Sequence, residues 1–204
     1  ASLSGLDIIV GGEVRDMDDV VRCYNRPGIT GVLIGKALAN GTIDLGDALA
    51  ETHATLAFES GVPRWKAEQR TLKSRLRHAL SRRHLAEHLP APEGLRVLDA
   101  GGGTGVDSLP LARQGAWVDL VDRSRAMLRE FREAAENAGA GSRVAEHAAD
   151  IREIKRRFPE DTFDLVLAHG VIQYSPDWEN LLVSMVAPLK SGGLLSLISR
   201  NWHA

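Results

Sequence analysis

The chain has 204 residues, of which 44% are hydrophobic, and a formal net charge of -2. This length is enough for one large domain or two small ones, and so small a net charge indicates no nucleic-acid or membrane partner by itself. Cys23 is the single cysteine, which excludes an intrachain disulfide framework and disfavours a cysteine-based zinc site, so we expect a cytoplasmic protein without a bound metal. No apolar run is long enough to cross a bilayer, so we expect no membrane partner.

The first quarter of the chain alternates short apolar runs with helical spacing. The runs at residues 6–10 and 31–34 read as buried strands, and residues 16–24 and 44–58 carry helical patterns. Strand, helix, strand, helix predicts a βαβα unit. Turn-forming residues at 60–63 mark a boundary, so we expect one domain over residues 1–59 and a second over 60–204.

A new series of elements follows that boundary. Residues 64–89 read as one long helix that is rich in basic side chains. Strands are expected at 96–100, 118–121, 144–147, 163–168 and 194–199, with helices at 126–138 and 178–189 and a turn at 190–193. Strands that alternate with helices predict a Rossmann-like, doubly wound parallel sheet in an α/β fold.

The glycine-rich turn after the first of these strands carries most of the functional information. The sequence VLDAGGGTG spans residues 97–105, and Asp122 and Asp150 end the next two strands. Glycines let the backbone approach a ligand, and ligands of open α/β sheets bind where strands end. Met127 and Ile151 would add apolar surface for an adenine ring. The alternatives are a tight turn without a ligand, aspartates that cap helices, and Met127 as ordinary core.

These stretches, together with FDLVL at residues 163–167, resemble the motif series of class I S-adenosylmethionine-dependent methyltransferases. Within that family the resemblance is to the type that methylates carboxymethoxyuridine at the tRNA wobble position, and it includes His169 and the pair Leu76-Arg77. It runs from about residue 64 to the last residue. It implies an enzyme that uses S-adenosylmethionine as its cofactor and methylates a tRNA or small-molecule acceptor.

The resemblance also implies roles for individual residues. The loop glycines would approach the methionine part of the cofactor, and Arg77 would pair with its carboxylate, since a guanidinium binds a carboxylate through two parallel hydrogen bonds. Asp122 would hold the ribose, and Asp150 with Ile151 the adenine. His169 would lie near the cofactor, unless it is a strand-end histidine satisfied by backbone groups. The full implied set is Arg77, Asp99, Gly101, Gly103, Gly105, Asp122, Met127, Asp150, Ile151 and His169.

No catalytic residue is assigned by the sequence. A sulfonium is already a strong methyl donor, so the protein mainly has to align the reacting atoms and exclude water. His169, Tyr174 and His203 are candidates for a general base on their position alone.

The basic helix has two interpretations. A tRNA acceptor would need a surface that contacts phosphates, whereas a solvated helix face explains the same charges equally simply. The basic residues are Arg64, Lys66, Arg70, Lys73, Arg75, Arg77, Arg82 and Arg83.

Residues 1–58 resemble the last two βα units of the histidine-biosynthesis phosphoribosyl isomerase barrel, a TIM-barrel fold. The resemblance implies a phosphate site at Gly11, Gly12, Gly35 and Lys36. Two βα units cannot close an eight-stranded barrel, so we expect a remnant of a longer protein, a shortened chain or an oligomerisation element.

The methyltransferase region is also incomplete, because members of that family usually add two further strands after the fifth. Three hypotheses therefore stay open. The chain is a methyltransferase, a phosphoribosyl-compound isomerase fragment, or a non-catalytic module that still binds the cofactor.

Overall fold

The computed structural model describes residues 8–11, 14–24, 29–45, 48, 62–89, 91–175 and 177–199. The chain divides into two compact units, Ala1–Phe58 and Glu59–Ala204. Each unit has its own hydrophobic core, so each is described by itself.

The first unit contains a parallel strand pair. Its elements are β1 (Ile8–Gly11), α1 (Met17–Tyr24), β2 (Ile29–Leu33) and the single turn α2 (Lys36–Ala39). β1 pairs with β2 in parallel, with α1 between them in the chain. The predicted helix at 44–58 lies almost entirely outside the described residues, and the barrel origin of this unit stays a prediction. Its buried core consists of Val14, Val20, Ala37, Ile43 and Ala48.

The second unit contains a five-stranded parallel sheet. Its strands are β3 (Arg96–Ala100), β4 (Trp117–Asp122), β5 (Val144–Ala148), β6 (Phe163–His169) and β7 (Leu189–Ile198). Its α-helices are α4 (Val62–Gln69), α5 (Leu72–His88), α6 (Leu109–Arg113), α7 (Arg125–Asn137), α8 (Ile154–Arg157) and α9 (Trp178–Val186), and its 3₁₀ turns are η1 (Gly141–Arg143), η2 (Ile151–Glu153) and η3 (Ile172–Tyr174).

The strand order of this sheet confirms the predicted doubly wound architecture. The order is β5-β4-β3-β6-β7, and every neighbouring pair is parallel. The chain therefore moves outward from β3 in one direction and then from β6 in the other. Ligands of such sheets bind at the carboxyl ends of the strands where this order reverses, here between β3 and β6.

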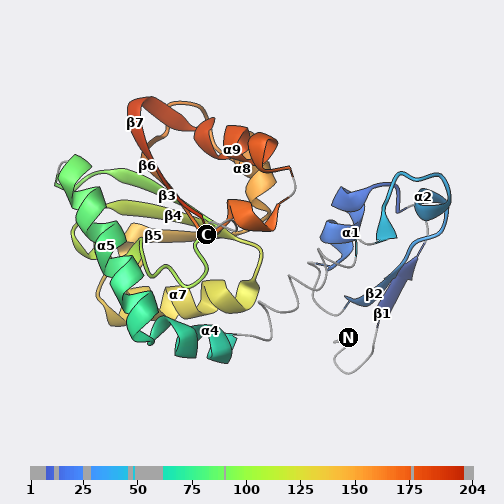
Figure 1. Cartoon of the computed structure of the whole chain (residues 1–204), viewed down its shortest axis with the longest axis horizontal. Coiled ribbons are helices and arrows are strands. Elements are labelled where there is room, and N and C mark those ends of the chain that lie inside the picture. The colour runs from blue at the N-terminus through green and yellow to red at the C-terminus, as the bar shows by residue number, and fades with distance from the viewer. Residues whose placement is uncertain are drawn as a thin grey trace. The chain divides into compact units, whose positions relative to one another are not determined.

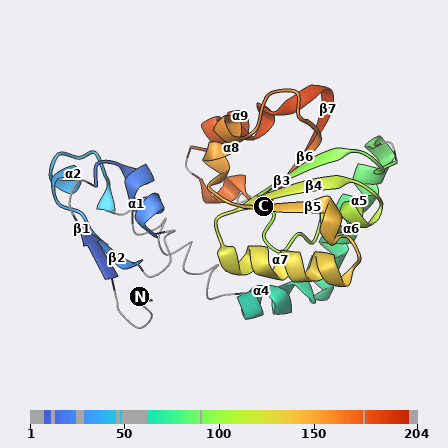
Figure 2. The same cartoon turned by 180° about the vertical axis from the view of Figure 1, so that it is seen from behind.

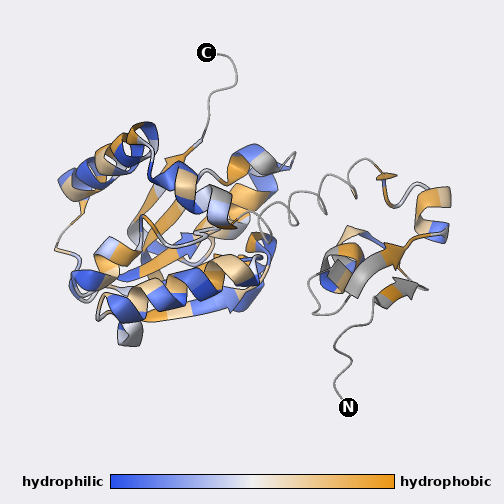
Figure 3. Cartoon of the chain, turned by 90° about the horizontal axis from the view of Figure 1, so that it is seen from below, coloured by the Kyte–Doolittle hydropathy of each residue, from blue (hydrophilic) through white to orange (hydrophobic). Residues whose placement is uncertain are grey.

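Helices cover both faces of the sheet, as Figures 1 and 2 show. On one side α4, α5 and α7 lie together, and a buried cluster joins Leu85, Leu120 and Phe131 from α5, β4 and α7. On the other side α8 and α9 pack Ile154, Leu181 and Met185 against the strands. Figure 3 shows apolar strands between helices that carry polar residues. Burial on both faces explains why the strands read as continuous apolar runs.

The predicted long basic helix at residues 64–89 is wrong, because the chain breaks into α4 and α5 at Arg70 and Thr71. Thr71 has extended backbone angles, and its side chain accepts a hydrogen bond from the Ser74 N–H, so it caps the start of α5. The cap is a local signal that the continuous basic pattern obscured.

Two further boundaries differ from the prediction. The turn expected at residues 190–193 lies inside β7, where a register shift between Phe163 and Leu165 of β6 accommodates the extra residues. α9 ends at Val186, three residues earlier than expected, and the short helix α6 was not predicted.

Gly105 has no room for a side chain. A Cβ atom at Gly105 would lie 2.2 Å from the Phe131 ring, and its φ of +69° is unfavourable for other residues. Gly139 has a similar φ of +70° but no atom within 4 Å of the Cβ position.

We predict that Gly105→Ala lowers the free energy of unfolding by roughly 3 kcal/mol or more, because it adds overpacking to backbone strain. Gly139→Ala is the matched control and should cost about 1 kcal/mol from backbone strain alone. Urea unfolding of both variants checks this. Equal losses in the two variants would contradict the Phe131 contact.

Candidate functional site

The loop after β3 is a backbone turn that only glycine can form. Gly101, Gly103 and Gly105 have φ angles of +69°, +55° and +69°. A Cβ atom on Gly102 would lie 2.4 Å from the Asp99 carboxyl carbon. The loop therefore folds directly over the buried Asp99 side chain, which explains the run of three glycines.

Asp122 connects this loop to the end of β4. Its Oδ2 atom accepts a hydrogen bond from the Gly103 N–H at 2.9 Å, and its Oδ1 atom accepts one from the Ser124 N–H at 2.8 Å. Ser124 in turn caps α7 by accepting from the Met127 N–H at 3.2 Å. A carboxylate offers about four acceptor sites, so Asp122 can hold both backbone groups and still accept from a hydroxyl.

Two glycines leave space beside the point where the strand order reverses. Gly103 follows β3 and Gly170 follows β6, and no atom lies within 4 Å of the Cβ position of either. Each has a positive φ. The open backbone on both sides, with the Asp122 carboxylate beside it, fits a ligand with ribose hydroxyls at this edge.

The residues expected around the adenine are near the ends of β4 and β5. Asp150 is buried, caps η2, and accepts hydrogen bonds from the Arg152 N–H at 2.8 Å and the Arg152 guanidinium at 2.9 Å. Burial alone would raise the Asp150 pKa, but the hydrogen bonds and the charges of Arg152 and Arg123 lower it. Met127 is buried in α7, and Ile151 is partly buried against the second core cluster.

A network that was not predicted converges on Asp107. Its Oδ1 atom is 2.9 Å from His78 Nδ1 of α5, and its Oδ2 atom is 2.9 Å from His169 Nδ1 of β6. His169 Nε2 lies 2.8 Å from the Ser196 hydroxyl of β7. The side chains of Asp107, His78 and His169 are 9%, 13% and 10% exposed. α5, the glycine loop, β6 and β7 are thus connected through one carboxylate.

The charge of Asp107 fixes the protons of both histidines. Burial alone would raise the Asp107 pKa, but the hydrogen bonds from His169 and His78 outweigh it and lower the pKa below its ordinary value. An ionised carboxylate only accepts, so both histidines must donate from Nδ1. In a neutral His78, Nε2 can then accept from the Arg77 guanidinium, which lies 3.3 Å away. Arg77 is exposed, and its guanidinium also lies 3.4 Å from the Ser74 hydroxyl.

Both ring nitrogens of His169 therefore meet side chains, those of Asp107 and Ser196, whereas the alternative interpretation of its position expected backbone partners. This network could not be predicted from the sequence, because its members are far apart in the chain. His78 and Asp107 are 29 positions apart, Asp107 and His169 are 62 apart, and His169 and Ser196 are 27 apart. An aspartate two residues beyond a glycine loop is not distinctive without the fold.

α4 also contacts the glycine loop. Gln69 Nε2 donates to the Thr104 hydroxyl at 3.1 Å, and Lys66 Nζ lies 2.5 Å from Glu130 of α7. The Gln69 contact places α4 beside the loop, as the contact between His78 and Asp107 does for α5.

Several predicted site residues are not tested by the described structure. Gly12 and His203 lie outside the described residues, and so does the side chain of Tyr174. Gly11 ends β1, and Gly35 and Lys36 are exposed at the start of α2. Over the described ranges the structure contains no cluster of metal-ligating side chains, and no helix there is long and apolar enough to span a membrane.

Asp99 is the acid whose pKa is shifted furthest in this region. Burial raises its pKa to about 7, and the charges of Asp107 and Asp122 add to the effect, while His169 opposes it. The folded protein therefore keeps Asp99 protonated at pH values where the unfolded chain ionises it.

We predict that the Asp99 carboxyl makes the wild type less stable as pH rises from about 4 to about 7, and that Asp99→Asn abolishes this effect. A raised carboxyl pKa makes the free energy of unfolding fall as pH rises through that window, because the folded state binds more protons there. The stability of the variant relative to wild type should rise across the window, by at most about 4 kcal/mol. Urea unfolding at a series of pH values measures it.

Asp107→Asn is the contrasting variant. In the wild type the pKa of the Asp107 carboxyl is lowered, so the contribution of this carboxyl to stability is lost only as pH falls below about 4. If the difference in the free energy of unfolding between Asp99→Asn and wild type stayed constant from pH 4 to pH 7, Asp99 would have to be ionised in the folded protein.

The second unit is similar to known methyltransferases. Residues 97–193 match the family model described as a methyltransferase domain. The tRNA 5-carboxymethoxyuridine methyltransferase of Escherichia coli K12 is 33% identical over 135 residues, covering 65% of this chain and 51% of that protein. The ubiquinone biosynthesis O-methyltransferase of Bradyrhizobium sp. ORS 278 is 36% identical over 126 residues, covering 58% and 46%.

The chain thus spans about half the length of the curated relatives it matches. Among solved structures, magnesium protoporphyrin IX methyltransferase of Synechocystis PCC 6803, with S-adenosylmethionine bound, superposes with a TM-score of 0.59 at 22% identity and covers 69% of this chain and 72% of that one. That likeness shows the fold. Residues 97–193 are thus similar to methyltransferase domains in sequence, and the second unit shares its fold with a methyltransferase whose structure contains S-adenosylmethionine.

Proposed function

We propose that this protein transfers the methyl group of S-adenosylmethionine to an acceptor at the carboxyl edge of the five-stranded sheet. The observation that carries the proposal is the Asp122 carboxylate bonded to the Gly103 N–H, beside the open backbone at Gly103 and Gly170. A strand-end carboxylate next to a glycine loop is suited to the ribose of an adenosyl group.

The remaining roles are proposed from the resemblance to class I methyltransferases. Gly101, Gly103 and Gly105 form the turn that lies against the methionine part of the cofactor. Arg77, oriented by His78, pairs with the cofactor carboxylate through its guanidinium. Asp150, Ile151 and Met127 form the adenine end of the site. The cofactor supplies an activated methyl group when bound, and the protein aligns the acceptor and excludes water.

We propose a modified tRNA nucleoside as the acceptor. The E. coli relative that acts on tRNA supports this, and so does the exposed basic surface of α5 beside the glycine loop. The ubiquinone relative supports a small-molecule acceptor instead. The basic residues of α5 that are exposed are Lys73, Arg75, Arg77 and Arg83.

We propose residues 1–59 and 60–204 as the two domains of the chain. The first would be a fragment of TIM-barrel type that joins copies of the chain or binds a phosphate ester. An isomerase function for it would require phosphate-ester binding that Lys36→Gln abolishes.

We predict that the folded protein binds S-adenosylhomocysteine saturably and that Asp122→Ala weakens this binding about tenfold or more, because charge-assisted hydrogen bonds to the ribose are lost. Gly103→Val should also weaken it, since a side chain would enter the open backbone. Isothermal titration calorimetry measures both.

Asp177→Ala is the matched control, because Asp177 is an exposed carboxylate that accepts a hydrogen bond from the Asn180 side chain. It should leave the affinity unchanged. An absence of S-adenosylhomocysteine binding by folded wild type would end the proposal.

We predict that the wild type transfers a tritiated methyl group from S-adenosylmethionine to bulk tRNA that carries its other nucleoside modifications, and that Asp122→Ala transfers it more slowly at limiting cofactor, because it binds the cofactor more weakly. Scintillation counting of precipitated tRNA measures it. Transfer to a small-molecule extract but not to tRNA would show that the acceptor is a small molecule and not tRNA. Cofactor binding without any transfer would favour a non-catalytic module.

A further inference from the structure

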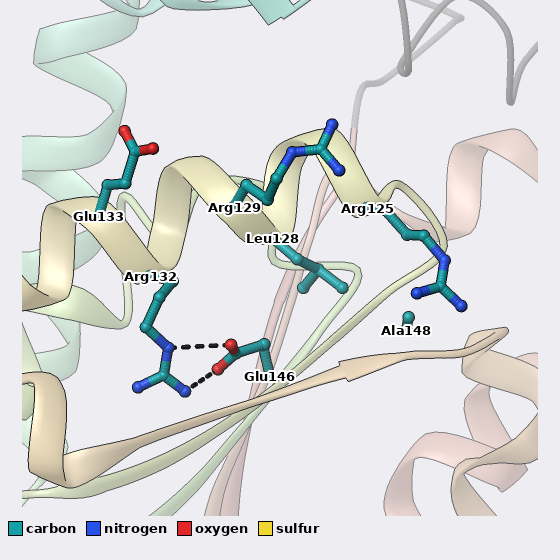
Figure 4. A pocket seen from close by; sticks show the side chains of 7 residues that line it. All are labelled: Arg125, Leu128, Arg129, Arg132, Glu133, Glu146 and Ala148. Atoms are coloured by element: carbon teal, nitrogen blue, oxygen red, sulfur yellow. Dashed lines mark hydrogen bonds and ion pairs between the residues drawn. The ribbon is translucent and has the colours of Figure 1, made fainter. Parts of the chain in front are cut away.

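A pocket of about 420 Å³ lies between α7 and β5, at the outer edge of the sheet (Figure 4). Three arginines of α7 line it, together with Leu128 and Glu133 of the same helix and Glu146 and Ala148 of β5. It includes none of the residues proposed to hold the cofactor.

Arg132 forms a fixed wall of this pocket. Its guanidinium bonds to both carboxylate oxygens of Glu146 and to the carbonyls of Gly141 at 3.1 Å and Val144 at 3.4 Å. β5 is an edge strand, so Arg132 covers polar backbone that would otherwise face solvent. These partners occupy Arg132 and leave it little capacity for a ligand.

Arg125 and Arg129 differ from Arg132. Both are exposed, and neither forms an ion pair with any side chain in the described part of the chain. They are spaced i, i+4, so their like charges repel, and Arg125 is the first residue of α7, where the helix dipole disfavours a cation. Helix physics alone therefore argues against this arrangement, and an anion bound between α7 and β5 would relieve both penalties.

The pocket has charged side chains at both of its ends. Ala148 ends β5 two residues before Asp150, which pairs with Arg152 at 2.9 Å and with Arg123 at 3.6 Å. Figure 4 shows Arg125 reaching towards Ala148, while Glu133 lies at the opposite end of the labelled helix segment. Of the charged side chains that line the pocket, a cation therefore lies nearest Ala148 and an anion lies at the far end.

We propose that the α7–β5 pocket binds a phosphate group, with the guanidinium forks of Arg125 and Arg129 as its donors. Arginine forks match phosphate geometry through paired hydrogen bonds. The phosphate belongs either to the backbone of an RNA or to a small phosphate ester. The proposal depends on α7 and β5 and is independent of the cofactor site.

The test compares two double variants of the full chain. Arg125→Gln with Arg129→Gln removes the proposed donors. Lys155→Gln with Arg156→Gln removes two exposed positive charges from α8 and is matched for net charge. The probes are a labelled uridine decamer and inorganic phosphate, titrated at low and moderate salt.

We expect the pocket variant, Arg125→Gln with Arg129→Gln, to bind the probe at least about tenfold more weakly than wild type, because two charge-assisted contacts are lost. The control variant should be nearly unchanged. If RNA is the ligand, the slope of log affinity against log salt should become shallower by about 0.7 in the pocket variant, since about 0.7 is lost per phosphate contact in single strands and the pocket holds one phosphate. Binding of inorganic phosphate alone would identify a small ester as the source.

Equal weakening in both variants would overturn the proposal, and so would unchanged binding in the pocket variant or no binding of either probe by wild type. Titration with S-adenosylhomocysteine separates the two proposals. The affinity for S-adenosylhomocysteine should be unchanged in the pocket variant. If wild type does not bind S-adenosylhomocysteine, the methyltransferase proposal is removed, and the phosphate result stands on its own.

Discussion

The hydrogen bond between the Gly103 N–H and the Asp122 carboxylate, at 2.9 Å, is the constraint on which the candidate site depends. It connects a glycine turn with positive φ angles to the end of the neighbouring strand, and it leaves open backbone on the ligand side. The parallel sheet makes this possible, because β3 and β4 both deliver their carboxyl ends to one edge. Neither the glycines nor the carboxylate would define a site without the other.

A second polar layer supports the first. Asp107 accepts from His78 and His169, so α5 and β6 are tied to the same loop through nearly buried groups. A fully satisfied buried network of this kind rigidifies its surroundings. Asp99 lies beneath the loop with its pKa raised to about 7, because burial and neighbouring carboxylates oppose its ionisation. The loop thus rests on two aspartates, Asp99 and Asp107, whose pKa values are shifted in opposite directions by their environments.

The sequence was informative where the signal is local. Apolar runs predicted the five strands, and the glycines with Asp122 predicted where the site lies, because strand ends and glycine turns can be recognised from neighbouring residues. The break at Thr71 was missed because a continuous basic pattern concealed a helix cap. The inclusion of residues 190–193 in β7 depends on pairing with β6, and the Asp107 network joins residues up to 62 positions apart. Such long-range contacts leave no pattern in a single sequence.

The fold alone does not determine the acceptor, since function depends on the site and relatives of this domain act on different molecules. What the account requires is an adenosyl group at one edge of the sheet. A crystal structure of the protein with S-adenosylhomocysteine tests this most directly. We predict that the ribose hydroxyls lie within hydrogen-bond distance of the Asp122 carboxylate, with the homocysteine part against Gly101 and Gly103. Ligand density away from this loop, or an Asp122 side chain directed away from the ribose, would contradict the account.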